Sequence, residues 1–215
     1  MDPGSRPRIR RRTGSYQAAD ARRAAIVEAA TRLFTEHGFH ETSIARVAAE
    51  AGTSQTGLLH HFNGKDTLLL AVLRSKDVSW AAQFSDVNQG LRVLLGHILE
   101  VIDEEAAAAG LTRLFVTTAA AAATPGHPAA EYFDQRYRTM RENNAAAIRA
   151  SIADGAIRAD IDPVGLGRAL VAVTDGLKMQ WLLAPDFDLP GQCRSHFDDL
   201  LRGISVDGSG LEGRG

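Results

Sequence analysis

The sequence predicts an all-α protein of about nine helices, in which a small N-terminal domain precedes a larger helical domain. Apolar residues recur every three or four positions along most of the 215 residues, which is the spacing of one helix face. No segment alternates apolar and polar residues for long enough to indicate a strand. Glycine, proline and aspartate interrupt the pattern at positions that fit helix ends.

The first predicted helix spans about residues 20–38, and its apolar stripe is expected to cover the segment that follows. The stripe consists of Ile26, Ala29, Ala30, Leu33 and Phe34. Residues 42–65 then indicate two short helices joined by a tight turn, followed by the start of another helix. Ser43 is a good N-cap residue, and Gly52 supplies the positive φ that ends a helix. Thr53 or Ser54 caps the second short helix.

The second short helix is only about two turns long, so it must be held by its neighbours. Leu58 and Phe62 are the residues that can anchor it inward. Its outward face is formed by small or polar residues, namely Gln55, Thr56, Gly57 and His61. A short, rigidly presented helix of this kind fits the major groove of DNA, which is about 12 Å wide. Residues 42–65 therefore predict a helix-turn-helix.

A joint pattern over residues 21–72 is more specific than any of its parts. Its residues are Ala25, Ile26, Ala29, Leu33, Phe34, Gly38, Thr42, Ser43, Ile44, Val47, Ala48, Ala51, Gly52, Leu58, His61, Phe62, Lys65, Leu68 and Leu69. This pattern resembles the TetR family of bacterial transcriptional regulators. For the remaining two thirds of the chain, the resemblance implies an all-helical ligand-binding and dimerisation body.

The resemblance also implies a double-stranded DNA operator as a partner. Ser43, His61 and Lys65 are expected at the phosphate backbone, and Gln55 is expected to pair with adenine. The full set expected at DNA is Thr42, Ser43, Ser54, Gln55, Thr56, Gly57, Leu59, His60, His61 and Lys65.

The chain departs from the family pattern at two places. Leu59 and His60 stand where the family usually has two tyrosines. Leu59 cannot donate a phenolic hydrogen bond, which leaves contact with a thymine methyl group as its expected role. Ile44 replaces a position that is often polar, so the first short helix is expected to read little sequence.

The charge distribution supports a polyanionic partner. Residues 1–76 hold 12 Lys and Arg against 7 Asp and Glu, whereas residues 77–215 hold 12 against 19. Taken alone, this difference would be explained equally well by an uneven solvated surface. Because the basic excess lies in the same part of the chain as the predicted helix-turn-helix, it favours nucleic acid as the partner. Residues 1–18 are expected to form a basic flexible arm, which either contacts DNA or acts as a solubilising tail.

The later helices are predicted over about residues 65–84, 91–109, 111–124, 128–154, 163–184 and 190–203. Asp162 followed by Pro163 is a strong helix start. We expect a DNA-binding domain over residues 19–66, an effector-binding and dimerisation domain over 67–204, and a flexible tail over 205–215.

Candidate ligand-binding residues are the aromatic, Met and polar side chains near apolar stripes. They are Trp80, Phe84, His97, Phe115, Thr118, Tyr137, Met140, Asn144 and Trp181. Residues of these types are expected either to line a pocket for an unidentified small-molecule effector or to form plain core.

The last two predicted helices carry apolar faces that are expected to pair with a second copy. The residues are Val164, Leu170, Val173, Leu177, Trp181, Phe197, Leu200 and Leu201. An internal core is the alternative, but a two-fold symmetric operator requires a symmetric dimer.

No motif indicates catalysis, a cofactor or a metal site, and Cys193 alone cannot form an internal disulfide. We expect a cytoplasmic protein with no membrane span, associated with the nucleoid when bound to DNA. The predicted function is a transcriptional regulator, a repressor that binds a palindromic operator as a homodimer and is released by a small molecule. Two alternatives stay open: an effector-independent DNA-binding protein of the same fold, and an all-helical small-molecule-binding protein or enzyme that does not use DNA.

Overall fold

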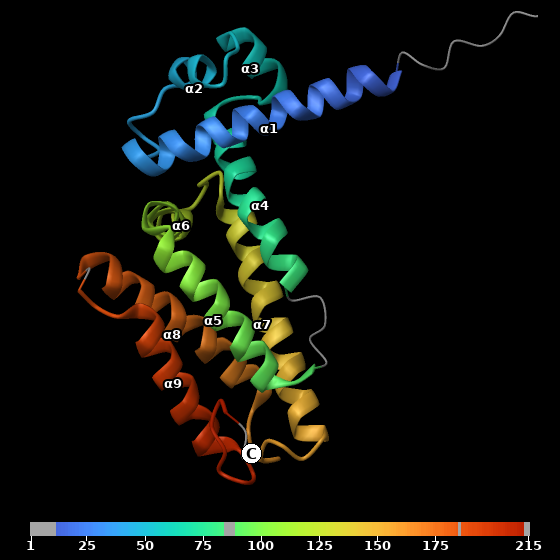
Figure 1. Cartoon of the computed structure of the whole chain (residues 1–215), viewed down its shortest axis with the longest axis vertical. Helices are drawn as coiled ribbons and strands as arrows, with labels where there is room; N and C mark the ends of the chain where they lie inside the picture. The colour runs from blue at the N-terminus through green and yellow to red at the C-terminus, as the bar shows by residue number, and fades with distance from the viewer. Residues whose placement is uncertain (1–11, 84–88, 185, 213–215) are drawn as a thin grey trace, which may run out of the picture. The chain divides into compact units, whose positions relative to one another are not determined.

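The computed structural model describes residues 12–83, 89–184 and 186–212, with side chains from residue 17 onward except over 78–83. These residues form helices without a strand (Figure 1). The helices are α1 (Arg12–His37), α2 (Ile44–Glu50), α3 (Gln55–His61), α4 (Lys65–Gln83), α5 (Leu91–Ala107), α6 (Ala109–Ala122), α7 (Ala130–Ala153), α8 (Pro163–Leu183) and α9 (Leu189–Ile204). The predicted all-α class with about nine helices is confirmed.

The chain divides into two compact units, Met1–Val72 and Leu73–Gly215. The division falls inside α4, whereas we expected it at residue 66. Helix α4 is one continuous helix. Its residues up to Val72 belong to the N-terminal unit, and its residues from Leu73 onward belong to the C-terminal unit.

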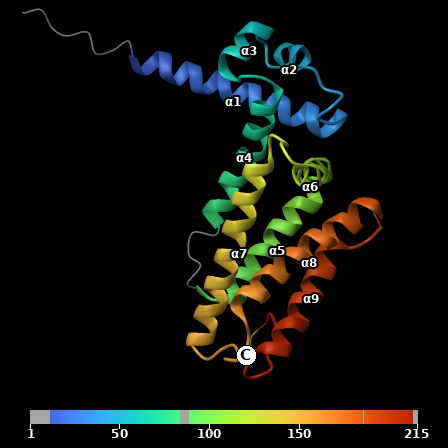
Figure 2. The same cartoon turned by 180° about the vertical axis from the view of Figure 1, so that it is seen from behind.

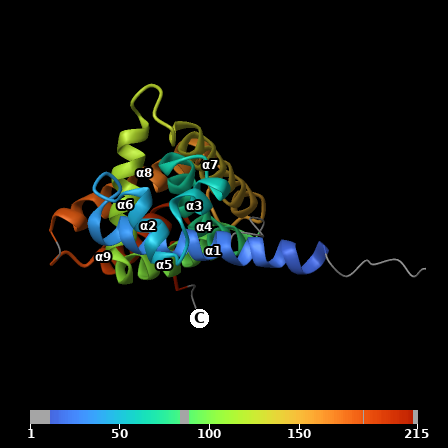
Figure 3. The same cartoon turned by 90° about the horizontal axis from the view of Figure 1, so that it is seen from above.

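The N-terminal unit is built around the apolar stripe of α1, against which α2 lies (Figure 3). The five predicted stripe residues are all buried, as are Val47 of α2 and Leu58 of α3. The turn between α2 and α3 depends on Gly52, whose φ is +65°, a conformation that glycine adopts without strain. Thr53 N–H donates to the Ala48 carbonyl across this turn at 2.9 Å.

The C-terminal unit has its main core between α5, α7, α8 and α9. Leu95 from α5, Ile148 from α7, Leu170 from α8 and Phe197 from α9 are all buried in it. Helix α7 packs along α8, as the view from behind shows (Figure 2). Each helix therefore contributes one apolar face to a shared core, which is the arrangement that the periodicity predicts.

Helices α7 and α8 approach so closely that one position requires glycine. A Cβ at Gly167 would lie 3.1 Å from the Ala145 nitrogen and 3.2 Å from the Arg141 carbonyl oxygen. Asn144 Nδ2 donates to the Gly167 carbonyl at 3.1 Å. Asn144, which we expected to bind ligand, therefore joins the two helices.

Both ends of the chain differ from expectation. Helix α1 begins at Arg12 instead of near residue 20, so residues 12–18 of the predicted arm are helical; the rest of the arm lies outside the described residues. At the other end, residues 205–212 make defined contacts where we expected a flexible tail. Val206 N–H donates to the Ala156 carbonyl at 3.0 Å, and Leu211 N–H donates to Asp198 Oδ1 at 2.8 Å.

Candidate functional site

Helix α3 separates an anchoring side from an outward side. Leu58 is 0% exposed and Phe62, which follows the helix, is 3% exposed. In contrast, the side chains of Gln55, Thr56 and His60 are exposed. Leu59 is 43% exposed, although it is a large apolar residue. The two anchors and the exposed Gln55 and Thr56 agree with the predicted faces of this short helix, whereas Gly57 and His61, which we expected to face outward, are half-buried.

Serine caps hold the two short helices in shape. Ser43 Oγ accepts from Arg46 N–H at 3.1 Å, and Ser54 Oγ accepts from Gly57 N–H at 3.0 Å. Ser54 is thus the cap that the sequence left open between Thr53 and Ser54. A Cβ at Gly57 would lie 2.7 Å from Thr53 Oγ1, so Gly57 leaves room for the cap.

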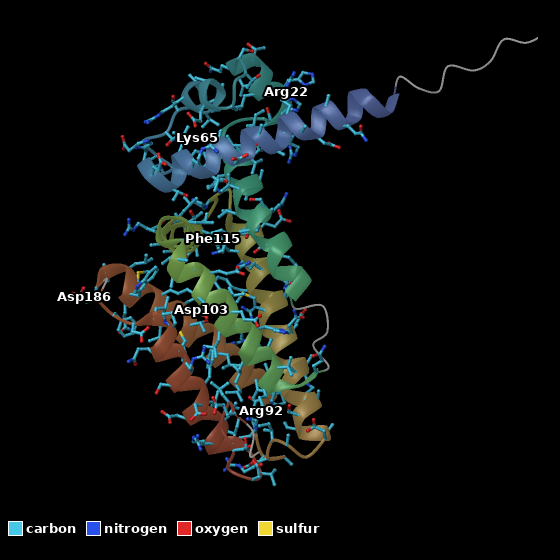
Figure 4. All side chains as sticks on the ribbon, viewed as in Figure 1. Arg22, Lys65, Arg92, Asp103, Phe115 and Asp186 are labelled. Atoms are coloured by element: carbon cyan, nitrogen blue, oxygen red, sulfur yellow. The ribbon has the colours of Figure 1, made fainter. Side chains whose placement is uncertain are left out.

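Lys65 and His61 lie at the ends of their helices with defined contacts in the N-terminal unit; Lys65 is labelled in Figure 4. Lys65 Nζ donates to the His40 carbonyl at 3.0 Å and lies 4.5 Å from the centre of the Phe39 ring. These contacts use one of the three N–H donors of the ammonium group. The His61 carbonyl accepts from Arg23 at 3.3 Å. Arg23 was not singled out from the sequence, because a lone arginine on a helix normally indicates a solvated face.

One predicted DNA contact is wrong. Thr42 is 1% exposed, so its side chain has no surface to offer. Its hydroxyl group lies 2.9 Å from the Gly38 carbonyl oxygen and 3.2 Å from that of Leu33. Thr42 therefore ties the end of α1 to the start of the helix-turn-helix, and its role is structural.

A cavity of about 260 Å³ lies in the C-terminal unit. It is lined by Glu105, Thr112, Phe115, Val116, Ala119, Ala120, Phe133, Arg136, Tyr137, Met140, Asp175, Lys178 and Met179. Three residues that we expected to bind ligand, Phe115, Tyr137 and Met140, are brought together there. Phe115 belongs to α6 and is labelled in Figure 4.

Other candidate ligand residues do not line this cavity. Thr118 donates its hydroxyl proton to the Leu114 carbonyl at 2.6 Å, which is a contact within α6. Trp181 packs against the main core, and His97 is half-buried on α5 and does not belong to the lining. The Trp80 side chain and Phe84 lie outside the described residues.

The sequence missed a group of charged side chains on the cavity lining. Glu105 of α5 has a side chain that is 4% exposed and lies between two lysines. Its Oε1 accepts from Lys76 Nζ of α4 at 2.9 Å, and its Oε2 lies 2.7 Å from Lys178 Nζ of α8. Burial opposes ionisation of Glu105, but the two ammonium charges outweigh it and hold the pKa of this carboxyl below its ordinary value.

A second ion pair joins α4 to α7 beside the first. Arg136 pairs with Asp77, and Tyr132 Oη donates to the same Asp77 carboxylate. Burial lowers the pKa of Arg136, as it does that of Lys76. The guanidinium carbon of Arg136 lies 5.4 Å from the centre of the Phe115 ring and Lys76 Nζ lies 4.8 Å from it. Two cations of the ion pairs that hold α4, Lys76 and Arg136, therefore lie against the Phe115 ring, which lines the cavity.

The polar floor of the cavity is completed by Tyr137 and Asp175. Tyr137 Oη donates to Asp175 Oδ2 at 2.8 Å, and burial together with this carboxylate raises the pKa of the phenol. Asp175 Oδ1 lies 3.8 Å from Lys178 Nζ. The cavity thus combines an apolar wall with both signs of charge.

A sequence signal for Glu105 and Lys178 did exist. Glu105 continues the helical stripe of Leu94, Ile98 and Val101, and Lys178 lies on the buried face of α8. A charged residue on an apolar stripe indicates a buried ion pair rather than a solvated face.

The predicted dimer residues fall into two classes. Leu170, Phe197 and Leu201 are buried in the core of the chain. The prediction that these three contact a second copy is wrong, because amphipathic helices bury the same stripe internally. Leu177, Trp181 and Leu200 pack against that core but are only partly buried, Val173 is half-buried, and Val164 is exposed.

His, Cys, Asp and Glu side chains do not gather in threes anywhere in the described ranges, as a metal site would require. Cys193 is buried, and burial raises the pKa of its thiol to about 11. Within the same ranges, every helix is too short or too polar to span a membrane.

Comparisons with known proteins agree with the geometry of both units. The family model described as "Bacterial regulatory proteins, tetR family" matches residues 26–72. The model described as "BetI-type transcriptional repressor, C-terminal" matches residues 91–205. The two matches cover the helix-turn-helix and most of the C-terminal unit.

Individual relatives are similar over nearly the whole chain or over the N-terminal part alone. TtgR, an HTH-type transcriptional regulator of Pseudomonas putida, is 27% identical over 205 residues, covering 86% of this chain and 94% of TtgR. RutR of Escherichia coli is 41% identical over 66 residues, which are 31% of each chain.

Solved structures share the fold. SmeT, the repressor of a multidrug efflux pump of Stenotrophomonas maltophilia, has a TM-score of 0.73 at 21% identity, with 86% of this chain and 91% of SmeT covered. A complex of SmeT with triclosan has a TM-score of 0.77 at 21% identity, with 91% and 96% covered. With its helix-turn-helix and its helical C-terminal unit, the chain belongs to the TetR family of bacterial DNA-binding transcriptional regulators.

Proposed function

We propose that this regulator is a repressor that places α3 of each of two copies in the major groove of a two-fold symmetric operator. The observation that carries the proposal is the division of α3 into buried anchors and an exposed polar face. A helix of seven residues is held rigid only through such anchors. Rigid presentation is what base recognition requires, because hydrogen bonds to base edges tolerate little misplacement.

Each exposed residue has a proposed role that follows from its chemistry. Gln55 pairs with an adenine through its amide group, Thr56 contacts a neighbouring base, and Leu59 packs on a thymine methyl group. Ser43, His61 and Lys65 contact phosphates and so fix the position of α3 on the duplex. The excess of basic residues in residues 1–76 supports the proposed contacts with phosphates.

We propose that α8 and α9 form the homodimer interface with residues other than the buried ones. Leu183 is 80% exposed, and Val164 and Met179 are also exposed large apolar residues of α8. At Gly176 of α8 and Gly203 of α9, an added Cβ would meet no atom within 4 Å. Small and apolar residues on one exposed face allow two copies of a helix pair to approach closely.

The small-molecule effector binds in the cavity of the C-terminal unit and shifts the population between two states of α4. Lys76 and Asp77 of α4 pair with Glu105 and Arg136, and these two partners line the cavity. A ligand that contacts Glu105 or Arg136 competes directly with the anchors of α4. It shifts the equilibrium by its difference in affinity for the two states. SmeT, which shares the fold, has been solved in a complex with triclosan, and this supports a small-molecule effector.

Selection of bound fragments from a random DNA pool, repeated at several salt concentrations, tests the proposal. We expect a palindromic consensus with half-sites about one DNA turn or somewhat more apart, and an affinity that falls steeply with salt. An asymmetric consensus or a monomer-sized complex would contradict the homodimer. No enrichment at any salt concentration would contradict DNA recognition by α3.

Two matched variants separate base reading from phosphate contact. Gln55→Ala is expected to relax the consensus at one position of each half-site, whereas Gln135→Ala, an exposed glutamine of α7, serves as its control. Lys65→Ala is expected to weaken binding to all sequences and to lower the salt slope by about one ion per subunit. A sequence-dependent effect of Lys65→Ala would contradict its assignment to phosphate.

A further inference from the structure

Helix α1 begins well before the part of it that packs against the N-terminal unit. Ile26 is the first buried residue among its described side chains, and residues 17–25 are all exposed. Together with the helical residues before them, they form an N-terminal extension, residues 12–25, which projects past α2 and α3 in Figure 1 and Figure 3. At a rise of about 1.5 Å per residue, residues 12–25 span about 21 Å. The described side chains of the extension are therefore available to a partner.

The basic excess of the N-terminal part of the chain lies in this extension and in the residues before it. Residues 1–25 hold 7 Arg against 2 Asp, whereas residues 26–76 hold 5 Lys and Arg against 5 Asp and Glu. In the second group, Arg32 already pairs with Glu28 and Glu50. The part of the chain that contains the helix-turn-helix is therefore electrically balanced. The cations that a polyanion requires belong to the start of α1 and to the residues before it.

Two arginines of the extension lie on the face of α1 that packs against the rest of the unit. Arg22 and Arg23 precede the buried Ile26 by four and three positions, a spacing that places all three on one side of a helix. The contacts of Arg23 agree with this placement, because it donates to the His61 carbonyl at 3.3 Å and its guanidinium carbon lies 4.4 Å from the centre of the Phe62 ring. Since His61 is the last residue of α3, the basic face of the extension lies beside the end of the proposed reading helix.

Arg22 is the cation of this face that can bind a phosphate. Its side chain is exposed and is labelled in Figure 4, and within the described ranges it makes no ion pair or side-chain hydrogen bond. Asp20 is the only acidic residue of the extension. Alanine, the best helix former, has a small side chain that lets a helix approach a DNA backbone closely. The extension contains five alanines, namely Ala18, Ala19, Ala21, Ala24 and Ala25.

We propose that residues 12–25 of α1 form a second DNA-contact element, which binds the phosphate backbone beside the half-site that α3 reads, with Arg22 as a direct phosphate contact. Phosphates are the same at every base pair, so these contacts add affinity without sequence information. The length of the extension, about 21 Å, corresponds to about six base pairs of duplex. The inference rests on the proposed DNA-binding function, and it adds a contact outside the helix-turn-helix.

Salt titration of the full-length protein on a duplex tests this contact. The duplex carries the consensus selected from random DNA, with about one helical turn of flanking DNA on either side. Arg22→Ala is expected to lower the salt slope by about one ion per subunit. Between about 50 and 200 mM salt, the affinity of the variant dimer should therefore fall about tenfold less than that of the wild type. Arg149→Ala, which removes an exposed arginine of α7, is the matched control and should bind like the wild type.

Two further variants separate a phosphate contact from an indirect effect on α3. Arg22→Glu should expose a stretch of backbone beside each half-site to hydroxyl-radical cleavage, because a carboxylate repels phosphate, while the consensus that it selects from random DNA stays that of the wild type. Asp20→Asn removes the acidic residue of the extension and should therefore bind several-fold more tightly than the wild type at low salt. Circular dichroism verifies that each variant is folded, which is expected because both side chains are exposed.

Each outcome decides the inference. A lower salt slope for Arg22→Ala, lost backbone protection for Arg22→Glu and an unchanged consensus support it. Binding of Arg22→Ala that equals that of Arg149→Ala at every salt concentration, or a consensus that changes in Arg22→Glu, overturns it. A protein that selects a palindrome but is indifferent to Arg22→Ala loses this inference alone, whereas one that enriches no sequence at any salt concentration loses the proposed function and this inference with it.

Discussion

Replacing Glu105 with glutamine is the sharpest test of the buried ionic network. The substitution keeps the shape of the side chain but removes the charge that Lys76 and Lys178 share at 2.9 and 2.7 Å. Both ammonium groups then lose this carboxylate, and Asp175 Oδ1 stays 3.8 Å from Lys178 Nζ. Removing one partner of a buried ion pair costs about 3–5 kcal/mol. For a chain of this size, the melting temperature should fall by about 6–20 °C.

Urea unfolding followed by circular dichroism measures this loss of stability. Glu100→Gln is the matched control, because Glu100 lies exposed on the same helix and its substitution should change the free energy of unfolding by less than about 0.5 kcal/mol. The double variant Glu105→Gln/Lys178→Met should lose less free energy of unfolding than the two single variants lose together, because it also removes one of the ammonium charges that Glu105→Gln leaves without its partner. Equal unfolding curves for Glu105→Gln and Glu100→Gln would contradict a stabilising role of the Glu105 ion pairs.

Three further predictions concern anchoring, the thiol and pH. Leu58→Ala should cost about 2–5 kcal/mol in the free energy of unfolding of the N-terminal unit, whereas Leu59→Ala should leave unfolding nearly unchanged and weaken DNA binding; similar unfolding curves for the two would contradict the two faces of α3. Cys193, with a thiol pKa of about 11, should react with a thiol reagent near pH 8 far more slowly in the native than in the urea-unfolded protein, and equal rates would contradict its burial. Because the pKa of Glu105 is lower in the folded than in the unfolded state, the folded state binds fewer protons. The difference in the free energy of unfolding between wild type and Glu105→Gln should therefore have its full value above the ordinary carboxyl pKa of 4.5 and shrink as the pH falls below it. A difference that grows on acidification would contradict a lowered pKa of Glu105 in the folded state.

Local signals account for what the sequence predicted well. The caps of α2 and α3, the turn at Gly52 and the anchors of α3 depend on residues close together in the chain, and each has its own chemical signature. The buried and exposed faces of α3 follow from helical periodicity alone. This is why the anchors of α3 and the turn between α2 and α3 could be predicted at the level of single residues.

Interactions between distant residues account for what was missed. Thr42 has the residue type of a phosphate contact, but its hydroxyl group lies within reach of carbonyl groups of α1 and its neighbour Gly38. Leu170, Phe197 and Leu201 lie on stripes that fit an internal core and an interface equally well. Glu105 and Lys178 each lie on an apolar stripe, which indicates a buried ion pair, but they are 73 positions apart in the sequence and nothing local identifies the partner of either.

The most direct test of α3 as the reading helix is the operator consensus of Gln55→Ala compared with that of the wild type. We expect both proteins to select the same palindrome, but the variant should no longer discriminate between bases at one symmetric pair of positions. The lost discrimination should amount to about 1–3 kcal/mol per base pair. An unchanged consensus with unchanged affinity at every position would contradict the claim that the exposed face of α3 reads the bases.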